Sequence, residues 1–402
     1  MSQTLSPAMT SASPRPNYGV IARNIFIAIV LTYPFLDLAF GWQALLAFIP
    51  MMLMITLAMG LNIVVGYAGL LDLGYAAFYA IGAYAAAFFT SPVSPLNAIL
   101  PNSPFFWMQD FWVAMFMAVL VAGTAGAMLG APTLRLRGDY LALVTLGFGE
   151  IVPRLVKNLE PWTKGVKGMN PIGRPYLFGC TFGVDPCTIF GTQYKLGMIP
   201  YYYVTLAIGA LSIFLIIRLR NSRLGRAWAA IRDDEIAAQG MGINPVTTKL
   251  WAFALGASFS GATGAIFGAY LQTISPDQFE YSTSVIVLCM VILGGTGNVW
   301  GVMFGGLLLQ SFDRIFAERL TGWVHKLGAA TGDPSVTAIF NSFDLLRSRL
   351  FIFGLCLVLL MTLRPQGLLP ARKRRESALI DETEDEATER HEAEAAVAGG
   401  TR

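Results

Sequence analysis

Residues 43–90 read QALLAFIPMMLMITLAMGLNIVVGYAGLLDLGYAAFYAIGAYAAAFFT and contain one charged side chain, that of Asp72. Two apolar runs, residues 43–65 and 74–90, flank a short stretch that contains glycines. A helix needs about 20 apolar residues to cross about 30 Å of hydrocarbon. The stretch therefore predicts two membrane-embedded helices separated by a break.

The remainder of the 402-residue chain has the same character. It is 55% hydrophobic and 13% charged, whereas a soluble domain carries about 25% charged residues. We expect an all-α, polytopic membrane helix bundle, and several apolar runs are shorter than a full span, which favours helices broken inside a protein-lined interior. About ten membrane-embedded segments are predicted, at residues 22–40, 43–65, 74–90, 111–131, 139–157, 201–219, 250–271, 284–294, 300–317 and 350–364.

Basic residues near the span ends predict the orientation. The cluster at 372–375 follows the last span, and such clusters stay on the cytoplasmic side. An even number of spans then places both termini in the cytoplasm, together with the Arg-rich loop 221–249. We expect a flexible tail at 1–21, a transmembrane domain at 22–370, and a basic anchor with a disordered acidic tail at 371–402. The acidic tail is either a solvated end or a docking arm.

Two segments of the chain break in a similar way at glycines. VVGYAG at 64–69 and ILGGTG at 292–297 both run from β-branched residues into a Gly-x-x-Gly sequence, one early and one late in the chain. Transporters build solute sites from discontinuous helices at corresponding places in two repeats; the alternative is a pair of ordinary turns. On the first interpretation the pathway residues are Asn62, Gly66, Tyr67, Gly69, Asp72, Gly294, Gly295, Thr296, Gly297 and Asn298.

The loop 221–249 predicts a short amphipathic helix outside the membrane. Leu224, Trp228 and Ile231 recur at helical spacing, glycines 240 and 242 end the helix, and Asn244 and Pro245 are typical of the start of the next span. The apolar ridge indicates docking into a groove of a cytoplasmic partner. The alternative is a helix resting on lipid headgroups, which the acids at 233–235 disfavour.

Other residues point to packing rather than chemistry. Glu150 lies within a span, where a carboxylate is either functional or paired, and Arg154 one turn later is a possible partner. Gly256, Ser260, Gly264 and Gly268 share one helix face, which is typical of close helix packing. Cys180 and Cys187 share a loop and are either bridged or free.

The sequence offers no catalytic, metal or nucleotide motif. It has two histidines and no GxxxxGK[ST] phosphate loop, so no enzyme activity, metal or cofactor is expected. A net charge of +3 gives no reason to expect nucleic acid as a partner; membrane lipid is the expected surroundings.

Four stretches together resemble the branched-chain amino acid ABC transporter permeases of the M type. They are GLLDLGYAAFYAIGAY (69–84), LRLRGDYLALVTLGFGEIV (134–152), AIRDDEIAAQGMGINPVTTKLWAFALGASFSGATGAIFGAY (230–270) and VILGGTGNVWGVMFGG (291–306). The resemblance covers about residues 45–365. It implies a bacterial inner-membrane permease that pairs with a second, homologous permease chain, two ATP-binding cassette ATPase subunits and a periplasmic substrate-binding protein.

In that family, loop 221–249 would couple transport to the ATPases. Positions 235, 237, 238 and 242 resemble a relaxed EAA-type motif, although the spacing departs from the strict pattern. The candidate coupling residues are Arg226, Trp228, Ile231, Arg232, Glu235, Gly240 and Gly242. Three alternatives remain: a permease for urea or short amides on the same architecture, an ion-coupled secondary transporter, and a membrane-embedded enzyme. The last two lack an ion cage and a catalytic set.

Overall fold

The computed structural model describes residues 30–40, 44–95, 109–133, 139–177, 179–184, 187–189, 192–194, 197–316, 319, 321–322, 326, 349–364 and 367–369. The expected tails at 1–21 and 371–402 lie outside these ranges. The chain divides into two compact units, Met1–Leu46 and Ala47–Arg402. In the first unit, the Asp37 carboxylate accepts hydrogen bonds from the backbone N–H groups of Ala44 (2.9 Å) and Leu45 (3.3 Å).

Each of the ten expected membrane segments overlaps a helix in the described residues, which confirms the all-α membrane bundle. Residues 22–29 of the first expected segment lie outside the described ranges. Five helices are long and apolar enough to cross a membrane, and three shorter apolar helices accompany them. The ten helices are Val30–Phe40, α2 (Leu45–Asn62), α3 (Tyr75–Thr90), α5 (Phe111–Thr133), α6 (Asp139–Asn158), α8 (Ile199–Arg220), α11 (Pro245–Leu271), α12 (Tyr281–Gly294), α13 (Val299–Ser311) and α16 (Arg349–Leu363).

Short elements connect these helices. The segment between α6 and α8 forms two antiparallel hairpins, β1 with β2 and β3 with β4, and its Cys180 is disulfide-bonded, while the side chain of Cys187 is outside the described set. The short elements are η1 (Ile63–Tyr67), α7 (Glu160–Thr163), η4 (Gly165–Lys167), β1 (Tyr176–Leu177), β2 (Cys180–Thr181), β3 (Cys187–Ile189), β4 (Thr192–Tyr194), α9 (Arg223–Asp233), α10 (Glu235–Gly240), η5 (Pro276–Phe279) and η6 (Phe312–Phe316).

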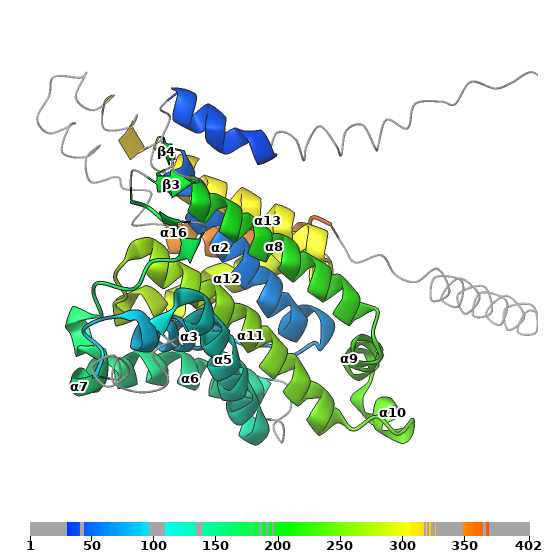
Figure 1. Cartoon of the computed structure of the whole chain (residues 1–402). Coiled ribbons are helices and arrows are strands. Elements are labelled where there is room, and N and C mark those ends of the chain that lie inside the picture. Colours follow the sequence, from blue (N-terminus) through cyan, green and yellow to red (C-terminus); the bar gives the residue numbers. More distant parts are fainter. Residues whose placement is uncertain are drawn as a thin grey trace, which may run out of the picture. The chain divides into compact units, whose positions relative to one another are not determined.

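Helix α11 packs against α5 and α3, and the three helices run close together in Figure 1. Its small-residue face permits this approach. A Cβ added at Gly264 would lie 2.4 Å from the Tyr79 carbonyl oxygen of α3, and one added at Gly261 would lie 2.6 Å from the Ala122 Cβ atom of α5. The predicted small-residue stripe therefore serves helix packing.

The contact between α3 and α11 is tightest where two glycines face each other. A Cβ added at Gly82 of α3 would lie 2.3 Å from the Cα of Gly261 of α11. Tyr75, at the start of α3, donates a hydrogen bond from its hydroxyl to the Gly256 carbonyl oxygen at 2.7 Å. Backbone approach and a buried hydrogen bond therefore fix α3 to α11, which positions the segment that precedes α3.

The start of α11 follows the expected capping pattern. The Asn244 side chain accepts a hydrogen bond from the backbone N–H of Thr247 at 3.3 Å, and Pro245 occupies the first helical position. Such a cap contributes about 1 kcal/mol. The helix therefore begins at Pro245, five residues before the apolar run that predicted it, because capping rather than hydropathy sets its start.

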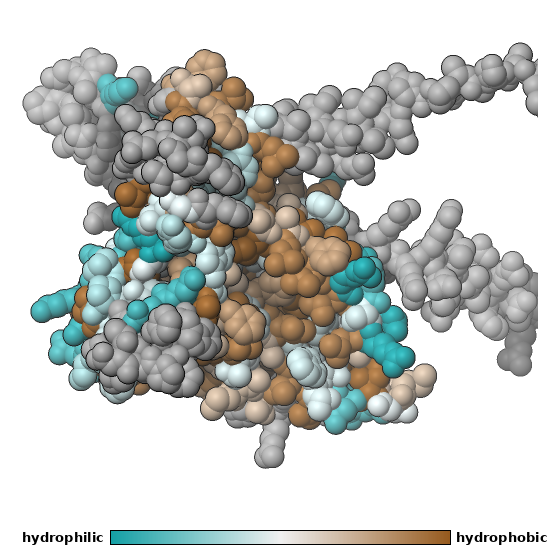
Figure 2. Space-filling view, in the orientation of Figure 1, coloured by the Kyte–Doolittle hydropathy of each residue, from teal (hydrophilic) through white to brown (hydrophobic). Residues whose placement is uncertain are grey.

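The surface changes character along the bundle. Figure 2 shows apolar residues spread over α8 and polar residues gathered around α9. Leu211 and Phe214 of α8 are 55% and 56% exposed. Lipid tails solvate such side chains as well as a protein core does, so this face suits contact with lipid or with another membrane chain.

Candidate functional site

The first glycine break lies at the end of α2. After Asn62 the chain passes through the π-helical turn η1 and continues without helix from residue 68 to residue 74, and α3 begins at Tyr75. A Cβ added at Gly66 would lie 1.9 Å from the Asn62 Oδ1 atom and 2.6 Å from the Gly297 backbone nitrogen. Glycine is therefore required at position 66 by a close approach to the second break.

The second break separates α12 from α13. Gly295 and Gly297 have φ values of +111° and +84°, a region that favours glycine. The Asn298 side chain then caps α13 by accepting a hydrogen bond from the Trp300 N–H at 3.2 Å. The segment after α16 covers this break, because the Leu368 N–H donates to the Leu293 carbonyl oxygen at 2.9 Å.

The two breaks touch each other although 235 residues separate their contacting atoms. The Asn62 Oδ1 atom accepts a hydrogen bond from the Gly297 N–H at 2.9 Å in a buried position. The Asn62 Nδ2 group is buried and has no hydrogen-bond partner in the described residues. The two glycine segments that the sequence singled out are thus one structural site.

Arg232, at the end of α9, reaches both breaks. Its Nη1 group donates to the Gly66 carbonyl oxygen, and its Nη2 group donates to the Thr296 hydroxyl at 3.3 Å. The side chain lies over Gly69, where an added Cβ would meet the Arg232 Cγ atom at 2.9 Å. The expected pathway residues and the expected coupling loop therefore meet at this arginine.

The apolar ridge of α9 faces the chain itself. Trp228 and Ile231 are 0% and 6% exposed, and the Trp228 indole N–H donates to the Thr248 carbonyl oxygen at 2.8 Å. The sequence pattern predicts that this ridge docks into a groove of a cytoplasmic partner. In the structure the ridge instead fixes α9 to the start of α11.

A second helix, α10, follows α9 where one continuous helix was expected. The Asp234 carboxylate accepts hydrogen bonds from the Ile236 and Ala237 N–H groups at 2.8 and 3.0 Å, which ends α9 and caps α10. Glu235 forms an ion pair at 2.7 Å with Lys249, whose side chain is 7% exposed. Helix α10 ends at Gly240, so the predicted stop at this glycine is confirmed.

Helix α10 and the turn after it present apolar side chains to the outside. Ile236 and Met241 are 70% and 85% exposed. Gly242 has a φ of +83° and, like Gly240, has open space around an added Cβ. Sequence reasoning missed this pair, because Ile236 lies two residues after the Asp234 cap and an amphipathic pattern does not reveal that cap.

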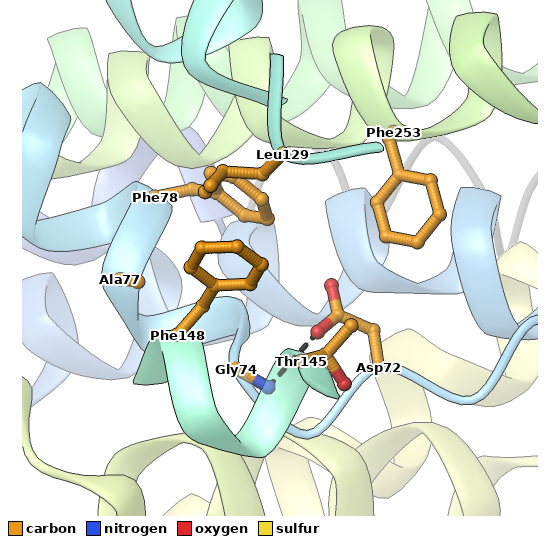
Figure 3. Close-up of a pocket in the computed structure, with 8 residues that line it drawn as sticks. All are labelled: Asp72, Gly74, Ala77, Phe78, Leu129, Thr145, Phe148 and Phe253. Carbon is orange, nitrogen blue, oxygen red and sulfur yellow. Dashed lines mark hydrogen bonds between the residues drawn. The ribbon is translucent and has the colours of Figure 1, made fainter. Parts of the chain in front are cut away.

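Asp72 lies apart from the junction of the two breaks, in the segment between η1 and α3. Its Oδ1 atom accepts a hydrogen bond from the Gly74 N–H at 2.9 Å, and its buried Oδ2 atom has no partner in the described residues. The carboxylate lies beside Thr145 (Figure 3) and lines a cavity of about 10 Å³, close to the size of one water site. Burial raises the pKa of Asp72 to about 6, against the lowering effect of the Gly74 hydrogen bond.

The aromatic walls explain why this carboxyl is desolvated. Phe78 of α3, Phe148 of α6 and Phe253 of α11 line the cavity in Figure 3. Rings of this kind offer no hydrogen bond to an ionised carboxylate, so the charged form is disfavoured.

The other candidate residues are buried in the chain or make contacts within it. Tyr67 is 8% exposed, and an added Cβ at Gly294 would lie 2.3 Å from the Gly301 carbonyl oxygen of α13. Asn298 also donates from its side chain to the Leu369 carbonyl oxygen at 2.9 Å. Arg226 is exposed and donates to the Asn221 carbonyl oxygen at 3.1 Å within its own loop.

Glu150 forms an ion pair with Arg154 at 3.0 Å, so of the two interpretations of this acid the structure favours a paired carboxylate. Both residues line a groove of about 410 Å³ between α6 and the start of α12. Lys157 in the same groove pairs with Asp277 at 2.6 Å. The charges of this groove therefore largely neutralise one another, at the opposite end of α12 from the second break.

Comparisons with known proteins give consistent matches. Residues 44–327 match the family described as the branched-chain amino acid transport system permease component. The high-affinity branched-chain amino acid permease protein LivM of Escherichia coli is 40% identical over 79% of this chain and 68% of its own length. The LivH permease of the same organism is 25% identical over 66% of this chain and 82% of its own length.

A ribose import permease, RbsC of Haemophilus influenzae, is 23% identical over 63% of this chain and 70% of its own length. No solved structure matches the chain.

Proposed function

This chain belongs to the branched-chain amino acid transport permease family, and from that premise we propose that it is the pore-forming permease subunit of an ATP-driven importer of branched-chain or related amino acids. It works in the bacterial inner membrane with both termini in the cytoplasm. A second, homologous permease chain, two ATPase subunits and a periplasmic substrate-binding protein complete the transporter. ATP hydrolysis takes place on the ATPase subunits.

The observation that carries the proposal is an exposed apolar pair, one residue in α10 and one in the turn after it, on a firmly held loop. Residues 223–242, which form α9, α10 and the following turn, are called the α9–α10 end. Ile236 and Met241 project from this end, while Trp228 and the Glu235–Lys249 pair hold it to α11. An apolar pair on a rigid support suits a groove of a soluble subunit. We therefore assign the docking surface for the ATPase to Ile236 and Met241.

The two breaks provide the moving part of the pathway. Their irregular backbone lies inside the protein, where such backbone is tolerated in a membrane. Movement of the α9–α10 end would change how the breaks contact each other, and the pathway would alternate between two states.

The amino acid branch is favoured over other cargoes by similarity. The relatives named for branched-chain amino acids are 40% and 25% identical to this chain, and the ribose permease is 23% identical. We assign the choice among amino acids to the substrate-binding protein.

A transport assay in reconstituted vesicles tests the proposal. Uptake of radiolabelled leucine should require the ATPase subunits and ATP, and should survive collapse of the proton gradient. Met241→Glu, and Ile236→Glu separately, should reduce recovery of the ATPase subunits with this chain. Leu211→Ser, on the exposed face of α8, is the matched control. Uptake without ATP that collapses with the proton gradient would contradict the proposal.

A further inference from the structure

We propose that Arg232 links the two glycine breaks through hydrogen bonds at the α9–α10 end, and that these hydrogen bonds break when α9 moves. We call this link the latch. The inference rests on the proposed function and adds a named contact through which the loop acts on the pathway. Arg232 is a positioning residue, since it acts on the pathway through the two breaks.

The contacts of the guanidinium carry the proposal. Its two terminal nitrogens donate to different breaks, one to the Gly66 carbonyl oxygen and the other to the Thr296 hydroxyl. The guanidinium holds its donors in fixed directions on separate nitrogens, so it suits two acceptors on different segments, whereas an ammonium group presents three rotating donors from a single nitrogen. Arg232 therefore ties together two segments that are far apart in the sequence.

The Arg232 side chain follows any movement of α9, because the helix is held rigidly on both sides of this residue. Ile231, the preceding residue, is buried, and Trp228 one turn earlier is bonded to Thr248 of α11. The Glu235–Lys249 ion pair adds a second attachment just after the arginine. A displacement of α9 would therefore carry Arg232 along rather than be lost in a flexible connection.

The surroundings of Arg232 make its contacts reversible. Arg232 is exposed, both of its acceptors are neutral, and it takes part in none of the ion pairs found among the described residues. Water can replace such acceptors more readily than it replaces a buried carboxylate partner. The Asn62–Gly297 hydrogen bond is buried, so the breaks share one link that is shielded from water and one that water can reach.

A cysteine reporter in the first break tests the latch. Ala68 is 2% exposed, so the cysteine of Ala68→Cys should react slowly with a maleimide in membranes that hold the complete transporter without ATP. Adding Arg232→Ala should speed the reaction at least ~10-fold, as expected when hydrogen bonds from a charged group are lost. Arg232→Lys should give an intermediate rate, because it keeps the charge and loses the fork.

Arg223→Ala is the matched control, since this exposed arginine lies on the first turn of the same helix. It should leave the reporter rate unchanged, and the chain without the reporter gives the background from its own cysteines. A rate for Arg232→Ala equal to that of Arg223→Ala would overturn the latch.

If the Arg232→Ala chain does not accumulate in the membrane, Thr296→Val tests the latch instead, because it removes one hydrogen-bond acceptor and leaves the arginine in place. An unchanged rate in that variant contradicts the proposal. Leucine uptake by the parent chain is measured in parallel. Uptake that needs no ATP would refute the proposed function, whereas the reporter rates would still answer whether the latch exists.

Discussion

At the scale of single residues, the same indole that marks the α9 ridge in the sequence is part of the core of the loop. Trp228 is fully buried and hydrogen-bonded to Thr248, while Met241 is 85% exposed. Burial decides what a substitution measures: a change at Trp228 alters folding, and a change at Met241 alters only what the surface can bind.

We predict that Trp228→Ala destabilises the α9–α10 end by about 3–5 kcal/mol, as other large-to-small changes at buried aromatic residues do. Met241→Ala should change stability by no more than about 0.5 kcal/mol. Thermal unfolding of the purified chain in detergent, together with protease sensitivity of the loop, would measure both. Equal stability of the two variants would show that the indole does not hold α9.

Asp72 gives a prediction for pH. Because burial raises the pKa of its carboxyl to about 6 from 3.8, its contribution to stability is fully present below about pH 4 and is lost as the pH rises through about 6. Asp72→Asn keeps an oxygen to accept from the Gly74 N–H and carries no charge.

The variant should therefore gain stability relative to the parent between about pH 5 and about pH 8, by an amount on the order of 1–3 kcal/mol. Thermal unfolding of both proteins at the two pH values measures the gain. A difference between parent and variant that is the same at both values would mean that the carboxyl is not desolvated.

At the scale of elements, hydropathy predicted which segments are helical, and capping decided where several of them end. The start of α11 at Pro245 follows from the Asn244 cap, and the division between α9 and α10 follows from the Asp234 cap. An amphipathic pattern cannot show a mid-helix cap, because an aspartate on a solvated face has the same pattern whether it caps or not.

The glycine breaks were visible in the sequence, but their contact was not. Gly-x-x-Gly sequences predict irregular backbone locally, whereas the Asn62–Gly297 hydrogen bond depends on how α2 and α12 pack. The sequence likewise does not predict which way the α9 ridge faces, because an apolar ridge fits a partner groove or the chain's own core equally well.

A substitution pair tests the close approach at the first break. Gly66→Ala places a Cβ 1.9 Å from the Asn62 side chain and 2.6 Å from the Gly297 nitrogen, so overpacking should cost about 1–3 kcal/mol and leucine uptake should fall. Gly147→Ala in α6 meets open space and should stabilise its helix by about 0.5–1 kcal/mol. Uptake and membrane abundance are measured for both, and normal uptake with Gly66→Ala would mean that the break tolerates separation.

At the scale of the whole molecule, the described chain carries apolar side chains along its spans and polar ones at the helix ends. Phe304 of α13 and Phe351 of α16 are 49% and 73% exposed, as lipid or a second permease chain would allow. The α9–α10 end combines exposed charges with Ile236 and Met241. This division between two kinds of surface is what a subunit with membrane and soluble partners requires.

The proposed orientation makes the last prediction. Met241 and Val166 are 85% and 66% exposed, and an even number of spans places position 241 in the cytoplasm and position 166 outside. A membrane-impermeant maleimide should therefore label Val166→Cys in intact spheroplasts, and should label Met241→Cys only in inside-out vesicles. Labelling of Met241→Cys should also fall when the ATPase subunits are present, because the proposed docking surface is then covered. Labelling of Met241→Cys in spheroplasts would reverse the orientation, and equal labelling with and without the ATPase subunits would remove α10 from the docking surface.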